Sequence, residues 1–160
     1  MKRFGESAPR VTAYVALGAN LGDARATVQA AVRDLNHLPH TALLRASSLY
    51  QTAPIDSTGP DYINAVAAIS TGLSSHALLA ALQSMEQAAG RLRPYQNAPR
   101  TLDLDILLFG DDMVQTPDLV IPHPRMGQRA FVLVPLAEVA PELVSTAQRL
   151  AVSAQAILKL

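Results

Sequence analysis

Two aspartates separated by a single residue are the feature of this sequence that most directly suggests chemistry. Asp103 and Asp105 lie in the segment Leu102–Phe109, in which every other residue is apolar. Such a segment predicts a buried strand, and residues two apart on a strand point to the same face, about 6.5–7 Å from each other. Neighbouring carboxylates repel each other and are costly to desolvate, so a cation is expected between them.

The expected cation is either Arg100 or a divalent metal ion. Oxygen ligands in a shallow site favour magnesium, which proteins usually hold through one or two carboxylates together with the phosphates of a substrate. The alternative is a strand end at which both aspartates are solvated or paired with arginine. The Asp-x-Asp pattern alone favours this alternative, whereas the segments around it, described below, favour a metal site.

Arginines gather around the aspartate strand, with no lysine among them. They are Arg91, Arg93, Arg100, Arg125 and Arg129. The planar guanidinium group forms paired hydrogen bonds with phosphate oxygens, so the cluster is compatible with a phosphate ligand. Surface arginines are common, and the cluster by itself is weak evidence.

Composition excludes several classes of protein. A chain of 160 residues with 49% apolar and 16% charged residues predicts one folded domain rather than a disordered chain. Thirteen basic residues balance thirteen acidic ones, which gives no overall charge to attract nucleic acid or a membrane surface. The absence of cysteine excludes disulfides, thiol catalysis and cysteine-zinc sites.

The start of the chain predicts a flexible extension followed by one domain. Met1–Arg10 is polar and lacks the apolar core of a signal peptide, and no stretch has the length of a transmembrane helix. We therefore expect a cytoplasmic protein with an extension over residues 1–10 and a single domain over residues 11–160. We also expect it to be a monomer without nucleic-acid or membrane partners.

The elements between these limits predict the order β-α-β-β-α-β. The expected strands are Val11–Leu17, Leu43–Tyr50, Ile63–Thr71 and Leu102–Phe109, and the expected helices are Ala24–Leu38 and His76–Ala89. This order is typical of the ferredoxin-like α+β fold, an antiparallel sheet with helices on one face.

Beyond this core, Gly110-Asp111-Asp112 predicts a hairpin turn into Met113–Gln115. Helices are expected toward the end of Phe131–Val139 and over Leu150–Leu160. Two long loops, Thr52–Tyr62 and Gly90–Arg100, adjoin the strands with polar residues, and such loops are often binding loops or lids.

Five segments, in this order along the chain, carry a resemblance to a known family. They are Gly18-Ala19-Asn20-Leu21-Gly22, Ser48-Leu49-Tyr50-Gln51-Thr52-Ala53-Pro54, Pro60-Asp61-Tyr62-Ile63-Asn64, Gly90-Arg91-Leu92-Arg93 with Pro99-Arg100-Thr101-Leu102-Asp103-Leu104-Asp105, and Val120-Ile121-Pro122-His123-Pro124-Arg125-Met126 with Arg129-Ala130-Phe131. From about Val11 to Leu143 the chain resembles the 6-hydroxymethyl-7,8-dihydropterin pyrophosphokinases of folate synthesis. The combination of Pro-Arg-Thr-Leu-Asp-Leu-Asp with the later Pro-His-Pro-Arg-Met is specific, whereas each alone is only suggestive.

The resemblance implies transfer of a pyrophosphoryl group from ATP to the hydroxymethyl oxygen of the dihydropterin, with release of AMP. It implies that Asp103 and Asp105 hold two Mg²⁺ ions and that Arg91 and Arg100 act with them in catalysis. Phosphoryl-type transfer depends on positioning and on charge neutralisation, which agrees with these residue types.

The resemblance also assigns two sets of binding residues. The ATP-binding set is Arg93, Arg100, Ile106, His123 and Arg129, and the pterin-binding set is Thr52, Ala53, Ile55, Tyr62, Asn64 and Phe131. His123 could instead be a core histidine that ties down the Pro-rich turn. For Phe131 the alternative is ordinary core packing, which its residue type alone would favour. A semi-buried amide such as Asn64 needs hydrogen-bond partners, which makes it the stronger candidate.

Some positions depart from the family pattern. Asn97 stands where some members carry a tryptophan, with Tyr95 nearby, so either residue could replace it in sealing the second loop. Pro124 occupies a position where some members have a tyrosine, and Asp118 one where some have an arginine. These differences predict that fewer side chains contact the nucleotide. Ala53 replaces a proline and should make the first loop more flexible.

Three other functions compete with this interpretation. A non-catalytic ferredoxin-like ligand sensor would need neither the aspartate pair nor the arginines. An RNA-binding sheet would need exposed aromatic residues on its strands and a basic face. A nucleotidyl transferase with an Asp-x-Asp strand would release pyrophosphate instead of AMP.

Overall fold

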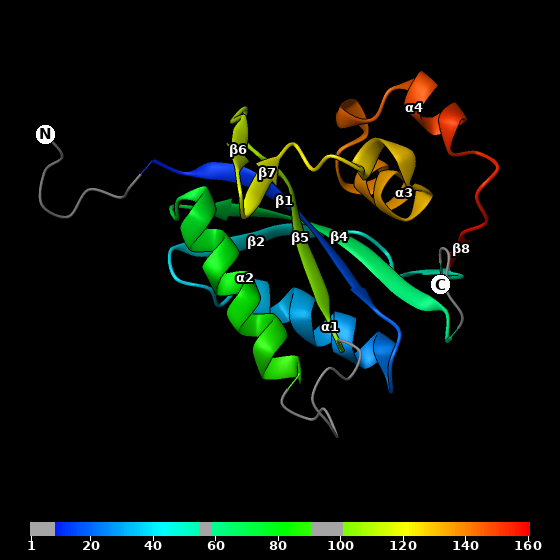
Figure 1. The fold of residues 1–160 in the computed structure, drawn as a ribbon, viewed down its shortest axis with the longest axis horizontal. Helices are drawn as coiled ribbons and strands as arrows, with labels where there is room; N and C mark the ends of the chain where they lie inside the picture. Colours follow the sequence, from blue (N-terminus) through cyan, green and yellow to red (C-terminus); the bar gives the residue numbers. More distant parts are fainter. Residues whose placement is uncertain (1–8, 55–58, 91–100) are drawn as a thin grey trace, which may run out of the picture.

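A computed structural model describes residues 9–54, 59–90 and 101–160 of the chain. It confirms the ferredoxin-like α+β class and the predicted order of the core elements. These elements are β1 (Val11–Ala19), α1 (Ala24–Leu35), β2 (Thr41–Ala46), β3 (Tyr50–Thr52), β4 (Tyr62–Thr71), α2 (Ser75–Ala89) and β5 (Asp103–Phe109). Figure 1 shows α1 and α2 packed on one side of the sheet.

Side-chain caps begin both core helices. The Asp23 carboxylate accepts the backbone N–H of Ala26 at 3.1 Å, and the Ser74 hydroxyl accepts that of Ala77 at 3.1 Å. Each bond satisfies one of the backbone donors that a helix start leaves without an intrahelical acceptor. The first helix ends at Leu35, three residues before the predicted end.

The sheet is antiparallel, and β1 and β4 form its centre. The strand order is β5-β1-β4-β3-β8, with β2 also paired to β4. The predicted strand Leu43–Tyr50 is therefore two strands, because β2 and β3 pair with different halves of the ten-residue β4. Among the strands that the structure describes, β5 pairs with β1 alone and thus forms an edge of the sheet.

The two faces of the sheet pack against different helices. Leu104 and Ile106 of β5 belong to the core under α1 and α2, whereas Leu107 belongs to a second core under the later helix α3 (Ala130–Val139). The core helices do lie on one face, as predicted, and α3 adds a layer on the other. Since the aspartates alternate with Leu104 and Ile106, their side chains point to the α3 side of β5.

The segments after β5 differ most from the prediction. The strands β6 (Val114–Thr116) and β7 (Leu119–Ile121) form a separate two-stranded sheet, so the turn at Gly110 does not pair β6 with β5. α3 is helical from Ala130 rather than only toward its end. Short 3₁₀ helices lie at Met126–Gln128 and Pro141–Leu143.

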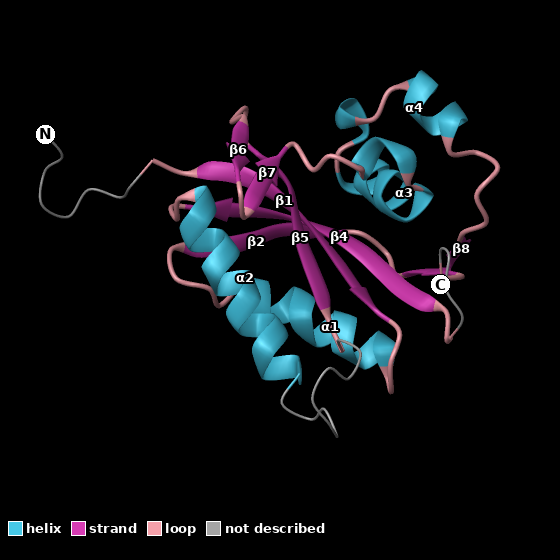
Figure 2. Ribbon diagram, viewed as in Figure 1, coloured by secondary structure: helices cyan, strands magenta, loops and turns pink. Residues whose placement is uncertain are grey.

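The predicted helix Leu150–Leu160 is wrong. A capping box of Ser145 and Gln148 begins α4 (Thr146–Ala151) earlier in the chain. The helix then ends, and the chain forms the short strand β8 (Leu158–Lys159) beside β3 (Figure 2). In the part of the chain that the structure describes, no helix has the length and apolar character needed to span a bilayer.

Candidate active site

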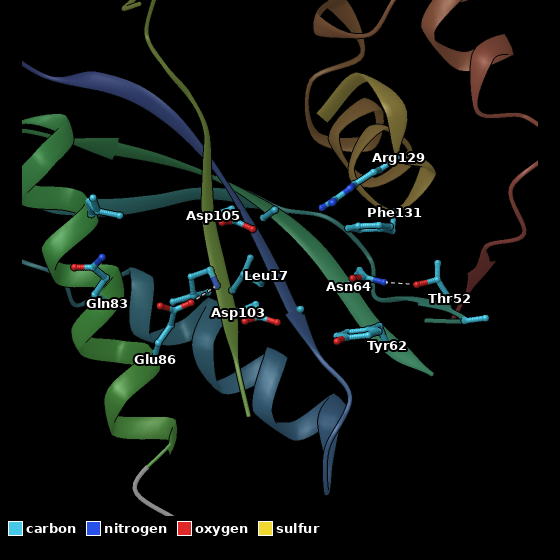
Figure 3. Close-up of a pocket in the computed structure, with 15 residues that line it drawn as sticks. Leu17, Thr52, Tyr62, Asn64, Gln83, Glu86, Asp103, Asp105, Arg129 and Phe131 are labelled. Carbon is cyan, nitrogen blue, oxygen red and sulfur yellow. Dashed lines mark hydrogen bonds between the residues drawn. The ribbon is translucent and has the colours of Figure 1, made fainter. Parts of the chain in front are cut away.

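A cavity of about 390 Å³ lies over the α3 side of the sheet and extends around the edge strand β5 toward α2 (Figure 3). Eight of the residues predicted to form the site line this cavity. They are Thr52, Ala53, Tyr62, Asn64, Asp103, Asp105, Arg129 and Phe131. They come from β3 and the residue after it, from β4 and β5, and from the N-cap and first turn of α3, so only the folded chain brings them together.

The register of the sheet explains how these residues share one surface. Gly18 of β1 pairs with Asp103 on one side and with Asn64 on the other. Directly paired residues on antiparallel strands point to the same face. One row across the sheet therefore carries a carboxylate, a glycine and an amide in that order, with Asp103 and Asn64 separated by a position without a side chain.

Small residues on β1 form the floor of the cavity. Ala16 pairs with Asp105 just as Gly18 pairs with Asp103, and both small residues line the cavity. A Cβ atom at Gly18 would lie 3.3 Å from the Asn64 Oδ1 atom. A larger side chain at either position would fill the space between the carboxylates and the amide.

The aspartate pair has the donor set of a magnesium site. Both carboxylates line the cavity from the same face of β5, Asp103 half-buried and Asp105 exposed. Within residues 9–54, 59–90 and 101–160, no group of three or more His, Cys, Asp or Glu side chains is arranged to hold a metal ion. Two carboxylates suffice for magnesium when substrate phosphates supply further oxygens, so these residues fit the predicted ion.

A polar and aromatic wall closes the other end of the cavity. Asn64 is buried, with 5% of its surface exposed, and its Nδ2 atom donates a hydrogen bond to the Thr52 hydroxyl at 2.8 Å. Figure 3 shows this pair between the rings of Phe131 and Tyr62. Two aromatic rings with an amide and a hydroxyl between them suit a flat heterocycle with a hydrogen-bonding edge.

Arg129 connects the two ends of the cavity. Its guanidinium carbon lies 5.2 Å from the centroid of the Phe131 ring, a cation–π arrangement. Figure 3 shows the charged end of this side chain directed from α3 toward Asp105 on β5. A positive charge thus lies between the carboxylate end and the aromatic end.

His123 lies near this charge cluster without lining the cavity. Burial lowers the pKa of its imidazole below the ordinary value of 6.5; the Asp105 carboxylate opposes this shift, and Arg129 and Arg125 reinforce it. The Nδ1 atom accepts the backbone N–H of Arg125 at 3.2 Å, so the neutral ring carries its proton on Nε2. This hydrogen bond within the Pro-rich turn agrees with the alternative role of His123 as a residue that ties down the turn. His123 also interacts electrostatically with Asp105 and Arg129.

Other predicted residues are not brought to the cavity or cannot be placed. The Ile106 side chain is buried in the core under α1 and α2, on the face opposite to the aspartates. Ile55, Arg91, Arg93 and Arg100 lie outside the described residues, as do Tyr95 and Asn97.

Sequence reasoning missed the contribution of α2. Leu79, Gln83 and Glu86 line the cavity from one face of this helix, and the Glu86 carboxylate accepts the backbone N–H of Leu104, between the two aspartates, at 2.9 Å. Spacings of four and three residues place these side chains on one face of a helix, and this periodicity was the signal that the sequence offered. It could not indicate which face of α2 meets β5.

The cavity combines an acidic end with an aromatic and amide end on an α+β fold, an arrangement compatible with a small-molecule transferase. Residues 14–141 match the family of 7,8-dihydro-6-hydroxymethylpterin-pyrophosphokinases (HPPK). The chain belongs to this family.

Curated relatives agree with this assignment. The chain is 48% identical over 131 residues to 2-amino-4-hydroxy-6-hydroxymethyldihydropteridine pyrophosphokinase of Pseudomonas aeruginosa, a match that covers 81% of each chain. It is 46% identical over 135 residues to the protein of the same name from Haemophilus influenzae, with 84% of each chain covered.

Solved structures support the fold. The wild-type HPPK-DHPS of Plasmodium falciparum matches with a TM-score of 0.64 at 14% identity, over 87% of this chain and 39% of that chain. The present chain thus spans well under half of that solved chain, and at this identity the likeness concerns the fold alone.

Proposed function

We propose that this protein transfers a pyrophosphoryl group from ATP to the hydroxymethyl oxygen of 6-hydroxymethyl-7,8-dihydropterin and releases AMP. The observation that carries the proposal is that the Asp103 and Asp105 carboxylates and the Asn64–Thr52 pair line the same cavity, across a floor of small residues. In a chain of the pyrophosphokinase family, this arrangement provides one end for a triphosphate and one for a pterin.

At the phosphate end, Asp103 and Asp105 would hold two Mg²⁺ ions, which when bound neutralise the charge of the triphosphate. The oxygen of the hydroxymethyl group attacks the β-phosphorus and its proton passes to solvent water, the bond from this phosphorus to the α,β-bridging oxygen breaks, and AMP leaves. Arg129 would bind phosphate oxygens close to the acceptor, and its position between the carboxylates and the aromatic wall supports this role.

The remaining nucleotide contacts are proposed from the family resemblance. Arg91 and Arg100 would act in catalysis, and Arg93 and His123 would join Arg129 in binding ATP. Ile106 can contribute only through its backbone, since its side chain lies in the core on the opposite face.

At the pterin end, Asn64 provides the hydrogen-bonding edge. One N–H of its amide is already donated to the Thr52 oxygen, which leaves the second N–H and the carbonyl oxygen for a ligand. The Thr52 hydroxyl proton remains free to donate. Phe131 and Tyr62 would flank the pterin ring, and Ala53 and Ile55 would complete the pocket.

The product of the reaction distinguishes this proposal from its rivals. The protein is incubated with ATP, Mg²⁺ and the dihydropterin, and the nucleotide product is identified by chromatography. AMP together with the pterin diphosphate supports the proposal. Release of pyrophosphate would instead identify a nucleotidyl transferase, and binding without turnover would identify a sensor.

The nearly isosteric Asp105→Asn variant serves as the control in this assay. It removes one negative charge from the proposed metal site while keeping the shape of the side chain, so AMP release should fall sharply.

We further propose that residues 11–160 form one catalytic domain that acts as a monomer in the cytoplasm, with ATP and the pterin as its small-molecule partners. Removal of residues 1–10 should then leave the rate unchanged.

A further inference from the structure

The two walls of the pterin end belong to elements that are not continuous in the chain. Phe131 comes from the first turn of α3, whereas Thr52 comes from the three-residue strand β3. Thr52 is held by Asn64, but a strand this short needs further support for a fixed position relative to α3. The separation of the walls decides whether a flat ligand fits between them.

Glu138 joins these two elements. It lies seven residues after Phe131 on α3, which is close to two helical turns and places both on the same face, about 10 Å apart along the axis. Its Oε2 atom accepts the backbone N–H of Ser48 at 2.7 Å and the Ser48 hydroxyl at 3.0 Å. Its Oε1 atom accepts the Tyr50 hydroxyl at 2.5 Å.

The protonation states keep these hydrogen bonds in place at neutral pH. Burial favours the neutral acid, but the hydrogen bonds from Tyr50 and Ser48 outweigh it and hold the pKa of Glu138 below its ordinary value. Burial, followed by the interaction with Glu138, raises the pKa of the Tyr50 phenol well above its ordinary value. The glutamate therefore remains an acceptor and the phenol remains a donor.

Tyr50 transmits this connection to the pterin end. It pairs with Asn64 on β4, and Thr52, two residues further along β3, pairs with Tyr62. Residues two apart on a strand share a face, so fixing Tyr50 also fixes the orientation of Thr52. On the outer side of β3, Tyr50 pairs with Lys159 of β8, whose amine lies 3.9 Å from Glu138.

Glu138 itself does not reach the ligand cavity. It is absent from the residues that line this cavity and lines instead a second cavity between α3, α4 and the segment after α4. Any effect of Glu138 on pterin binding must therefore pass through β3 and α3.

We propose that Glu138 is a positioning residue for the pterin, which sets the separation between Phe131 on α3 and the Thr52–Asn64 edge without touching the substrate. This inference rests on the proposed function, since it assigns the aromatic and amide end of the cavity to the pterin. It gives the Ser48–Tyr50 segment a role in substrate affinity as well as in folding.

Two variants test the inference, with one matched control. Glu138→Gln replaces the charged acceptor with a neutral amide, and Tyr50→Phe removes a single hydrogen bond and should fold even where the first variant does not. Glu142→Gln makes the same chemical change at an exposed position of the next short helix. Pterin and ATP-analogue affinities are measured by titration, and the two KM values by AMP release.

We expect Glu138→Gln to weaken pterin binding about tenfold, equivalent to about 1.4 kcal/mol, and to change ATP-analogue affinity less than twofold. Tyr50→Phe should have a smaller effect of the same kind, and the double variant should lose less than the sum because the two residues share a hydrogen bond. Glu142→Gln should resemble the wild type. An equal loss of both affinities, or unchanged pterin affinity in Glu138→Gln and Tyr50→Phe, would overturn the inference.

The proposed function fails in a different way. If the wild type binds the pterin but releases no AMP, the pyrophosphokinase proposal is wrong, while the titrations still decide the role of Glu138. If the wild type does not bind the pterin under any condition, both proposals are overturned.

Discussion

A methyl group added at Gly18 should separate the stability of the protein from its affinity for the pterin. Gly18 has no left-handed backbone conformation, so alanine can adopt the same strand geometry. Replacing glycine by alanine at such a site stabilises a protein by about 0.4–1 kcal/mol, because the unfolded chain loses conformational freedom. The free energy of unfolding of Gly18→Ala should therefore differ from that of the wild type by less than about 1 kcal/mol, because this gain is opposed by the cost of moving the Asn64 amide.

The same methyl group should disturb the edge that binds the pterin. Its carbon would lie 3.3 Å from Asn64 Oδ1, 3.9 Å from the Ile63 carbonyl oxygen and 4.0 Å from Tyr62 Cδ1. The Asn64 amide must then move by a few tenths of an ångström, although it is buried and held to Thr52 at 2.8 Å. A hydrogen bond contributes about 0.5–1.5 kcal/mol net, so misaligning one or two bonds to the ligand should cost about 1–2 kcal/mol. This corresponds to about 5- to 30-fold weaker pterin binding.

Urea denaturation and titration calorimetry measure these two effects separately. Pterin affinity is determined in the presence of a non-hydrolysable ATP analogue and Mg²⁺, and the affinity for the analogue itself should change less than twofold. Gly127→Ala is the matched control, because a Cβ atom at that position meets no other atom within 4 Å. Unchanged pterin affinity in Gly18→Ala, or an equal loss of analogue affinity, would refute the role assigned to the cavity floor.

Three further predictions concern the aspartate pair, the coupling between the two ligands, and the pH dependence of the stability that Glu138 contributes. Asp105→Ala should abolish magnesium-dependent AMP release. It should not lower the urea midpoint, because it removes repulsion between the two carboxylates. Retention of more than about a tenth of the activity, equivalent to roughly 1.4 kcal/mol, would contradict the metal site. Pterin should bind weakly alone and more tightly in the presence of the ATP analogue and Mg²⁺, and the pterin should raise the affinity for the analogue by the same factor. Identical pterin affinities with and without the analogue would count against cooperation between the two ends. Since the pKa of Glu138 is depressed in the folded protein, its stabilising contribution is present above its ordinary pKa of 4.5 and disappears as the pH falls through the lower folded value. The stability difference between the wild type and Glu138→Gln, measured by urea denaturation, should therefore narrow as the pH falls below 4.5, and a constant difference down to pH 3 would contradict this reasoning.

Local patterns predicted the elements of the core and the geometry of the aspartate pair. The alternation of Asp103 and Asp105 with Leu104 and Ile106 is a property of the strand itself, and the structure places the two sets on opposite faces as predicted. The two helices of the core were predicted from their periodicity and capping residues, which act within a few residues. Such signals are readable because neighbours in the sequence are also neighbours in the element.

The C-terminal part shows where local patterns fail. Leu150–Leu160 has apolar residues compatible with a helix, yet Leu158–Lys159 pairs with Tyr50 and Gln51, more than 100 residues earlier in the chain. The open edge of β3 provides backbone hydrogen-bond partners that no local pattern can reveal. The bond between Tyr50 and Glu138, which are 88 residues apart, is equally invisible in the sequence.

By itself, the sequence determined which residue types are available and how they alternate along each element, and its motifs were sufficient to indicate the family. The tertiary structure alone decided that Gly18 lies between Asp103 and Asn64, that Glu86 of α2 meets the edge of β5, and that α3 covers the face of the sheet bearing the site. The physical reason is that strand register and the choice of helix face depend on burial summed over the whole sheet. Contacts between distant segments set that sum, and no short stretch of sequence contains it.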